Sequence, residues 1–380
     1  MYASLPLFKQ ELEQEVHRIL RYWMQYAVDE QYGGFYGKID HDNRPYHVPK
    51  GSVLHARILW TFSAAFTHYK EPAYIKMAHR AYQYILDRFI DHKYGGVYWS
   101  TNNERKQIYA HAFAIYGLSE YYRATQWEPA RQLAIHLYEL VQRFSFDTHN
   151  GGYLEAFTAD WQPIADMRLS DKDVNEKKTM NTHLHVLEAY TSLYGIWPDA
   201  RLEESIVLLL GVFNKHFIRK GHLQLFFDEH WQPRSDDISH GHDIEASWLL
   251  TEAANALADP VLIQQTEKQA LLLADAVAPD IDGGIWSENE KHWWPQAEAM
   301  LGFFNAWQIS NRDGYLQQAL NSWTFIKKYM LDHVNGEWFW GVDAHHQALI
   351  KEDKAGFWKC PYHNTRACLE IIKRLDLPED

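Results

Sequence analysis

Apolar residues recur at three-and-four spacing along most of the chain, in paired segments that are separated by short polar connections. Residues 56–70 and 71–91 form one such pair, and residues 111–125 and 128–145 form another. This spacing predicts amphipathic helices. The second member of each pair opens with Glu-Pro-Ala, which is typical of a helix start with proline in the first turn. The pattern therefore predicts pairs of helices rather than a sheet.

Each predicted pair is followed by a glycine turn and then by aromatic residues. The last glycines of these turns are Gly34, Gly96, Gly152, Gly221, Gly284 and Gly336. They lie 62, 56, 69, 63 and 52 residues apart, so a unit of about 60 residues occurs six times. Glycine provides the positive φ or the close approach that a sharp turn after a helix requires. The aromatic residues that follow each turn are expected to form a short strand.

Six helix pairs can close a ring. In each pair the first helix is expected inside, because it carries polar residues among apolar ones, and the amphipathic second helix outside. We therefore predict an all-α fold, an (α/α)6 barrel of about twelve helices with short β-hairpins at one mouth, as a single domain over residues 1–380. The alternative is an open solenoid of helical hairpins, which would not need clustered histidines.

Composition narrows the possible partners. The chain has 37 Lys and Arg against 50 Asp and Glu, a net charge of −13, and no basic run, which argues against nucleic acid and anionic lipid. The N-terminal residues lack the pattern of a signal peptide, and no stretch approaches the roughly 18–20 apolar residues of a membrane span. Two cysteines, Cys360 and Cys368, fit a reducing compartment. We expect a cytoplasmic protein, monomeric or weakly homo-oligomeric, with a small-molecule partner.

Polar residues at the start of the expected inner helices are the candidates for chemistry. Asn181 and His185 are four residues apart and share a helix face, whereas His183 points elsewhere. His242 and Glu245 are three residues apart and also share a face. Each pair alone is compatible with a structural role, such as a hydrogen-bonded core histidine or a surface ion pair.

Three further segments follow the same pattern. Trp294 and Glu298 are four residues apart with Trp293 adjacent, Arg57 lies in an otherwise apolar helix, and Trp358 and His363 flank a Cys-Pro pair. His185, His242 and His363 occupy equivalent places in different units, so a closed ring would bring them to one axis. Convergence of this kind favours a shared site over separate structural roles.

A metal centre is the first alternative for these residues. Cys360, His363 and Cys368 lack a Cys-x-x-Cys element, so their spacing does not favour zinc. The three convergent histidines could bind a metal, but Glu245 beside His242 equally supports an acid–base pair in which the carboxylate fixes the imidazole tautomer. No phosphate-binding glycine loop or serine elbow is present. We expect no metal and no cofactor.

Four long motifs, at residues 178–194, 241–250, 293–307 and 358–374, closely resemble those of the cellobiose 2-epimerases, a branch of the N-acylglucosamine 2-epimerase superfamily. The resemblance extends over essentially the whole chain. It implies an (α/α)6 barrel, in agreement with the repeat count. It also implies interconversion of a reducing-end D-glucose with D-mannose at C2, without metal or nucleotide.

The resemblance also implies roles for individual residues. His242 and His363 would be the two bases, one removing the C2 proton and the other returning it through a cis-enediolate. His185 would donate to the O1/O2 region, Arg57 would pair with the oxyanion and Glu245 would orient His242. The implied substrate contacts are Tyr109, Asn181, Trp293, Trp294, Trp358, Glu288 and Glu298.

Several activities share these motifs or this barrel. A mannose 2-epimerase acting on monosaccharides and a mannose aldose–ketose isomerase are the main alternatives, and the polar segment 168–179, expected to loop over the mouth, would decide whether a second sugar fits. An inverting glycoside hydrolase is a further alternative, and it would need two carboxylates, such as Glu245 and Glu298, about 6.5–9.5 Å apart. A non-catalytic sugar-binding barrel is the last.

Overall fold

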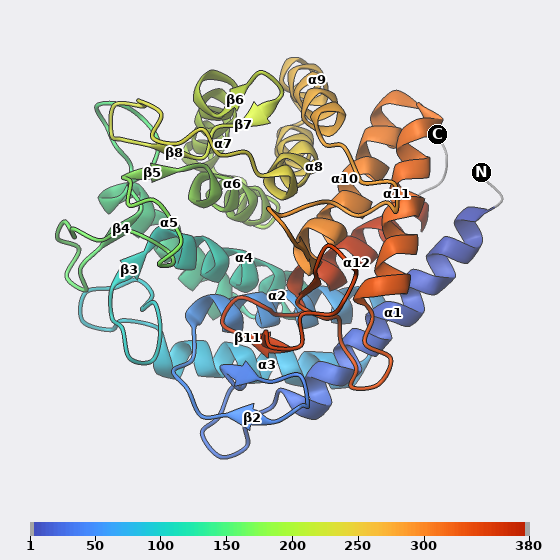
Figure 1. The fold of residues 1–380 in the computed structure, drawn as a ribbon. Coiled ribbons are helices and arrows are strands. Elements are labelled where there is room, and N and C mark those ends of the chain that lie inside the picture. Colours follow the sequence, from blue (N-terminus) through green and yellow to red (C-terminus); the bar gives the residue numbers. More distant parts are fainter. Residues whose placement is uncertain (1–3, 377–380) are drawn as a thin grey trace.

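The computed structural model describes residues 4–376, which form a closed ring of paired helices (Figure 1). Each inner helix packs against the next one around the ring, and the last packs against the first. The inner helices are α2 (Ser52–Tyr69), α4 (Ile108–Thr125), α6 (Met180–Tyr194), α8 (His240–Leu257), α10 (Trp293–Ser310) and α12 (Tyr362–Asp376).

An outer layer of helices covers this ring. Each outer helix packs mainly against one inner helix. Helix α1 packs against α12, so the first and last helices of the chain are neighbours (Figure 1). The outer helices are α1 (Leu5–Tyr26), α3 (Pro72–Arg88), α5 (Glu128–Phe144), α7 (Ala200–Val212), α9 (Pro260–Ala276) and α11 (Asp313–Phe325). A π-helical turn extends α7 (η2, Phe213–Phe217) and α11 (η3, Ile326–Met330).

Burial follows the predicted assignment of inner and outer helices. Every residue from Ser52 to Ala65 in α2 and from Ile108 to Tyr121 in α4 is buried, whereas α3 and α5 bury one face only. The residues described thus contain the twelve α-helices of an (α/α)6 barrel, as the repeat predicts. None of the helices described within residues 4–376 is both long and apolar enough to span a membrane.

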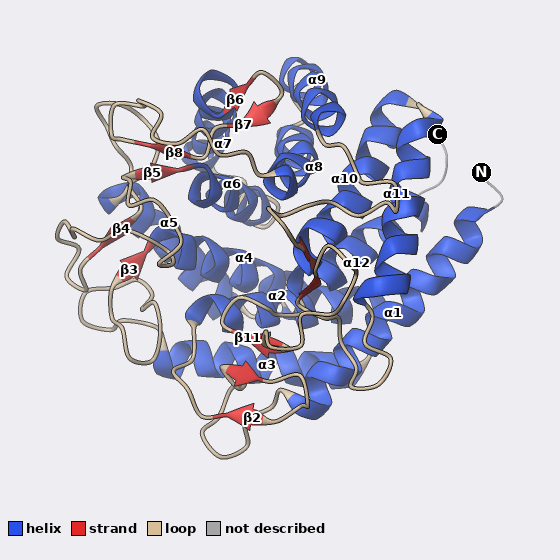
Figure 2. Ribbon diagram, viewed as in Figure 1, coloured by secondary structure: helices blue, strands red, loops and turns tan. Residues whose placement is uncertain are grey.

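Short antiparallel strands lie in the loops of the ring (Figure 2). One sheet has the order β11 (Ala355–Gly356), β1 (Lys38–Ile39), β2 (Pro45–Tyr46). The remaining pairs are β3 (Lys106–Gln107) with β4 (Ala156–Phe157), β5 (Lys178–Thr179) with β8 (Phe226–Phe227), β6 (Ile218–Arg219) with β7 (His222–Leu223), and β9 (Lys291–His292) with β10 (Gly341–Val342). Most of these strands pair across neighbouring units and so join successive loops.

Among the described residues, a strand directly follows the glycine turn at Gly221 (β7), but the expected strand directly after each of the other turns is wrong. Phe35, Tyr153 and Trp338 each form a single isolated bridge with a residue before the turn. The reason lies in the next inner helix. The backbone N–H of Phe35 is donated to Nε2 of His55, 3.1 Å away, and the N–H of Tyr153 is donated to Nε2 of His183, 2.8 Å away. A side chain therefore takes the donor that a longer strand ladder would use.

A buried histidine at the fourth position of an inner helix explains the repeated glycine pair. In α4, Nε2 of His111 accepts the N–H of Val97 at 2.9 Å, and Nδ1 bonds the carbonyl oxygen of Gln107 at 2.7 Å. Gly96 has a φ of +85°, and a Cβ atom at this position would lie 2.6 Å from Nε2 of His111. Glycine is required here for both its backbone conformation and its lack of a side chain.

In five of the six units, a buried ion pair connects the turn to the segment that leads into the next inner helix. In the second unit, Asp91 Oδ1 accepts the N–H groups of Lys93 and Tyr94, and Nζ of Lys106 lies 2.7 Å from Asp91 Oδ2. The corresponding pairs are Asp29 with Lys50, Asp147 with Lys178, Asp282 with Lys291 and Asp332 with Lys354. The unit around Gly221 has no such pair among the residues that the structure describes.

Candidate active site

The first two turns of the inner helices carry the polar side chains of the candidate site. Arg57, His185, Glu245 and Glu298 are the sixth residues of α2, α6, α8 and α10, respectively. One turn earlier, the second residues of α4, α6, α10 and α12 are Tyr109, Asn181, Trp294 and His363. Residues four apart share a helix face, so both sets point in the same direction from their helices. The ring thereby gathers residues that are far apart in the sequence.

A cavity of about 1090 Å³ opens at the mouth between α6, α8 and α10. It reaches the histidine cluster at Asn181, His242 and Trp294, which are part of its wall. Glu288 lies in its outer wall. The polar segment predicted to loop over the mouth does so, because Arg168, Leu169, Lys172, Asp173, Val174 and Glu176 all line this cavity.

His363 is held by a carboxylate from the neighbouring helix. Its Nδ1 lies 2.7 Å from Oε1 of Glu298, and both side chains are buried. Burial alone would raise the pKa of Glu298, but Arg366 and His363 outweigh it and lower that pKa, so the carboxylate is charged. An ionised carboxylate only accepts, so Nδ1 of His363 carries the proton and Nε2 presents its lone pair. Burial lowers the pKa of His363 to about 3 and keeps the ring neutral.

His185 is held in the same way by its own helix. Nδ1 lies 2.8 Å from Oε2 of Glu188, one turn further along α6. Burial lowers the pKa of His185, and Arg366 keeps the pKa of Glu188 below its ordinary value despite burial. The neutral ring therefore presents an unprotonated Nε2. The expectation that His185 donates a hydrogen bond to the sugar requires that this imidazole first accept a proton.

His242 has a hydroxyl partner instead of a carboxylate. Its Nδ1 lies 2.7 Å from Oγ of Ser239, the residue that precedes α8. Burial lowers the pKa of His242 to about 3. The prediction that Glu245 orients His242 is wrong, because no hydrogen bond joins the two among the described residues and Glu245 instead binds Arg366 at 2.8 Å. Helix spacing placed both residues on one face but did not reveal this cation.

Arg366 is the buried hub of the carboxylates. One nitrogen, Nη2, lies 2.8 Å from Glu245 and 2.6 Å from Glu298, and Nη1 bonds Glu188. Burial together with the neighbouring Glu298 raises the pKa of Glu245. Tyr362 also donates its hydroxyl proton to Glu188. His185 and His363 are thus joined through one network.

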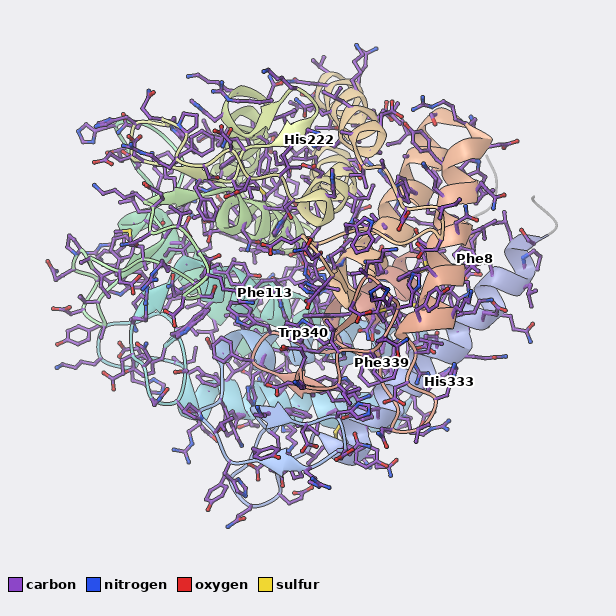
Figure 3. All side chains as sticks on the ribbon, in the orientation of Figure 1. Phe8, Phe113, His222, His333, Phe339 and Trp340 are labelled. Atoms are coloured by element: carbon purple, nitrogen blue, oxygen red, sulfur yellow. The ribbon has the colours of Figure 1, made fainter. Side chains whose placement is uncertain are left out.

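Arg57 and Tyr109 form a second pair beside His185. Nη2 of Arg57 donates to the hydroxyl of Tyr109 at 2.7 Å, and the guanidinium lies 4.1 Å from the ring centre of Phe113. Phe113 faces the middle of the ring of helices (Figure 3). The rings of Tyr109 and His185 are 5.1 Å apart, edge to face. A cation and a hydroxyl group therefore lie next to one of the three histidines.

The N-acylglucosamine 2-epimerase (GlcNAc 2-epimerase) sequence model matches residues 33–367. The chain belongs to the N-acylglucosamine 2-epimerase family. The cellobiose 2-epimerase of Bacteroides fragilis is 47% identical over 387 aligned residues, which cover 96% of this chain and 99% of that protein. The solved structure of cellobiose 2-epimerase from Bacillus thermoamylovorans B4167 aligns with a TM-score of 0.92 at 38% identity and covers 97% of this chain and 100% of its own. That of Spirochaeta thermophila DSM 6192 aligns with a TM-score of 0.90 at 37% identity and covers 98% of each chain.

Of the three tryptophans predicted to contact the sugar, Trp294 and Trp358 lie near candidate site residues, whereas Trp293 is buried elsewhere. Trp294 lines the cavity, and its ring centre lies 4.8 Å from that of His242 and 5.6 Å from that of His363. Trp358 lies 6.0 Å from Tyr109, edge to face. The prediction that Trp293 contacts the sugar is wrong, because this residue is buried against Trp340, and adjacent helix residues project in different directions.

Glu298 is also not the sugar contact that the sequence suggested. It is fully buried and is held by His363, Arg366 and Trp248, so it positions a histidine rather than a substrate. Sequence reasoning missed Glu188, Tyr362 and Arg366. Two of them could have been predicted from the sequence. Glu188 and Arg366 each follow a candidate histidine by three residues and so share its helix face.

Proposed function

We propose that this enzyme is a sugar 2-epimerase that interconverts the reducing-end D-glucose of cellobiose with D-mannose, giving 4-O-glucosyl-mannose. One observation carries the proposal. His242, half-buried, and His363, buried, come from two different helices, are neutral imidazoles and both contact Trp294 at the cavity. Epimerisation at a carbon next to an aldehyde needs two proton-transfer groups, one for each face of that carbon. The two imidazoles are suited to this task.

The proposed reaction begins on the ring-opened sugar. One histidine removes the C2 proton, and the electron pair moves through the C1–C2 bond to give a cis-enediolate. Rotation about C2–C3 then exposes the other face. The second histidine, which has taken up a proton from solvent, returns it to C2, and the first histidine releases the abstracted C2 proton to solvent. His363 is suited to removing a proton, because Glu298 holds its Nδ1–H and leaves the Nε2 lone pair free.

Negative charge on O1 and O2 of the enediolate needs fixed electrostatic partners. Arg57 and Tyr109 are suited to this role, since the pair is buried and its hydrogen bond aligns the guanidinium with the hydroxyl. Asn181 has a buried Oδ1 without a hydrogen-bond partner among the described residues, and it lines the cavity. A sugar hydroxyl would supply the donor that this oxygen lacks.

A disaccharide substrate is favoured over a monosaccharide. The cavity volume, about 1090 Å³, slightly exceeds that of ordinary ligand sites, which measure roughly 300–1,000 Å³. Its wall includes loop residues within 167–176 and 286–290 in addition to Asn181, His242 and Trp294. Cellobiose is also the sugar in the names of the relatives described above.

The hydrolase alternative loses its support. Glu245 and Glu298 bind the same guanidinium nitrogen of Arg366, at 2.8 and 2.6 Å, so their oxygens are closer together than the roughly 6.5–9.5 Å that inversion requires. Both groups are therefore assigned to positioning.

Proton NMR of the enzyme in D₂O, with cellobiose and in parallel with mannose, tests the proposal. We expect deuterium at C2 together with the anomeric signals of 4-O-glucosyl-mannose. Exchange with mannose and glucose alone would identify a monosaccharide epimerase, and fructose would identify an aldose–ketose isomerase. Release of glucose from cellobiose, or no exchange with either sugar, would contradict the proposal. The single catalytic domain over residues 1–380, the cytoplasmic location and the monomeric or weakly oligomeric state stay predictions.

A further inference from the structure

The unit around Gly221 departs from the other units in two ways. Its turn is the two-residue Lys220–Gly221 connection of the β6–β7 hairpin. In four of the units described above, those before α2, α4, α6 and α10, a lysine two residues before the inner helix pairs with an aspartate of the turn. Before α8 this position is Ile238, which is exposed. The cation that neutralises the aspartate elsewhere is therefore missing here.

The fourth residue of α8 is also different. Three inner helices have a histidine at this position, and α10 has Gln296, which accepts the N–H of Ile285 in the same manner. In α8 the residue is Asp243, and its Oδ1 accepts the N–H of Leu223 at 2.8 Å. One carboxylate oxygen of Asp243 thus accepts the backbone N–H that a histidine Nε2 accepts in three other units. The second oxygen is left for another partner.

Two histidines converge on that second oxygen. Nδ1 of His222 lies 2.8 Å and Nδ1 of His240 lies 3.9 Å from Oδ2 of Asp243, and one ligand atom from each residue lies within 4.8 Å of the others. Nδ1 of His240 is buried and has no hydrogen-bond partner among the described residues. Asp243 is fully buried, and the charged groups that act on it are these two histidines, without a lysine or arginine.

We propose that His222, His240 and Asp243 form a binding site for a divalent transition metal ion, and that zinc is the ion that fits best. Two imidazoles and one carboxylate are a ligand set typical of zinc sites, and water would complete a tetrahedral shell. The side chains of His222 and His240 are 27% and 36% exposed, so an ion can enter from solvent. Figure 3 shows His222 on the β6–β7 hairpin, beside α8 and α9.

A second group with metal-ligand chemistry does not qualify. Glu245, Glu298 and His363 also lie within 4.8 Å of one another, but the guanidinium of Arg366 already binds both carboxylates. A metal ion would have to displace this buried cation. Among the described residues, only the His222–His240–Asp243 group is free of such a competing cation.

The ion would join two parts of the fold. His222 belongs to the hairpin, whereas His240 and Asp243 belong to the first turn of α8. His242 lies between the two α8 ligands in the sequence and reaches the cavity. The ion would therefore fix the helix start that carries one of the two proposed bases, without taking part in the proton transfers. An ion that binds the native state also stabilises it by mass action.

Isothermal titration calorimetry with zinc chloride alone, on the full chain after dialysis against a chelator, tests the site. We expect one equivalent of zinc to bind wild type, and His222→Ala to weaken this binding at least about tenfold, since even partners of metal ligands contribute 10–100-fold. Asp243→Asn keeps an oxygen for the N–H of Leu223 but loses the charge, and we expect the same loss. His333→Ala, a change at an exposed histidine of another unit (Figure 3), is the matched control and should bind like wild type.

Two additional measurements keep the result decisive if a variant is less stable. Far-ultraviolet circular dichroism establishes that each variant is folded before titration. Cobalt(II) added in place of zinc should give the intense visible absorption of a tetrahedral site in wild type and in His333→Ala, but not in His222→Ala. Equal zinc affinity in wild type and folded His222→Ala, or no zinc binding by wild type, would overturn the proposal.

Discussion

Nδ1 of His363 donates a hydrogen bond to Oε1 of Glu298, 2.7 Å away on the neighbouring inner helix. The same oxygen accepts a hydrogen bond from Nη2 of Arg366 at 2.6 Å. The carboxylate thus fixes the tautomer of the histidine, and the arginine keeps the carboxylate charged. A neutral histidine with a free Nε2 is thus the product of three residues, of which only His363 would act on the substrate in the proposed reaction.

Replacing Glu298 with Gln should slow epimerisation by roughly 10–100-fold while the protein stays folded, because the loss of an orienting partner has effects of that size. Glu298 raises the pKa of His363 relative to burial alone, so its loss should lower that pKa further and shift the acid limb of the rate profile to lower pH. Deuterium incorporation at C2, measured across pH, reports both effects. Glu128→Gln, on the exposed surface of α5, is the control, and an unchanged rate and profile in Glu298→Gln would refute the positioning role.

His242→Ala and His363→Ala should each abolish epimerisation, with losses of about 10²–10⁴-fold, since each removes one of two proton-transfer groups. If the two residues serve opposite faces of C2, either variant can still exchange the proton of one epimer without inverting it. NMR in D₂O distinguishes exchange from inversion in a single experiment. Epimerisation above a few per cent of wild type in a folded variant would exclude that histidine as a principal base.

Stability should fall as the pH drops below about 6.5. Burial lowers the pKa of His55, His111 and His183 to about 3, so between about pH 6.5 and 3 the unfolded chain binds protons that the native state does not. Each such histidine adds a slope of about 1.4 kcal/mol per pH unit.

The chain itself supplies a substitution that tests this slope. Gln296 performs the task of His111 in another unit and does not titrate. Urea unfolding of His111→Gln at pH 6 and pH 5 should show a free-energy loss that is about 1.4 kcal/mol smaller than in wild type. Equal losses in the two proteins would mean that His111 does not contribute.

The barrel was predictable because it depends on periodicity. Apolar spacing and six glycine turns specify the helices, their pairing and their number, and these features are local in the sequence. The histidines were predictable as a set because all three lie in the first two turns of inner helices, but the prediction that they occupy equivalent places is wrong, since His185, His242 and His363 are the sixth, third and second residues of their helices.

The partners of these histidines were not predictable, because they depend on which neighbouring helix supplies the nearest charge. Glu245 is three residues from His242 and shares its helix face, yet Arg366 of α12 binds it. Likewise, Trp293 and Trp294 are adjacent in sequence, but only Trp294 lines the cavity. Helix spacing gives the direction of a side chain, whereas pairing depends on distances across the ring.

Substitutions at the adjacent glycines Gly151 and Gly152 can distinguish backbone strain from steric conflict. Both Gly151 and Gly152 have a φ of +75°, but a Cβ on Gly151 meets nothing within 4 Å, whereas one on Gly152 would lie 2.5 Å from Trp231 and 2.8 Å from Nε2 of His183. Gly151→Ala should destabilise the protein by about 1–2 kcal/mol, the strain of the left-handed region. Gly152→Ala should cost clearly more, because a buried ring must also move. Similar unfolding free energies for the two variants would refute the role of the close approach to His183.

The buried pair of Lys106 and Asp91 allows a test of the repeated turn. Both side chains are inaccessible to solvent, so Lys106→Met should leave an unpaired buried carboxylate and cost about 3–5 kcal/mol. Asp91→Asn keeps an oxygen for the two turn N–H groups, and adding it to Lys106→Met should recover part of that loss, because the uncompensated charge is removed. The exposed pair of Arg131 and Glu128 is the control, for which a loss below about 1 kcal/mol is expected. Chemical unfolding of wild type, Lys106→Met, the double variant and a variant of the exposed control pair measures these differences in free energy. A double variant less stable than Lys106→Met would show that the pair acts through packing rather than charge.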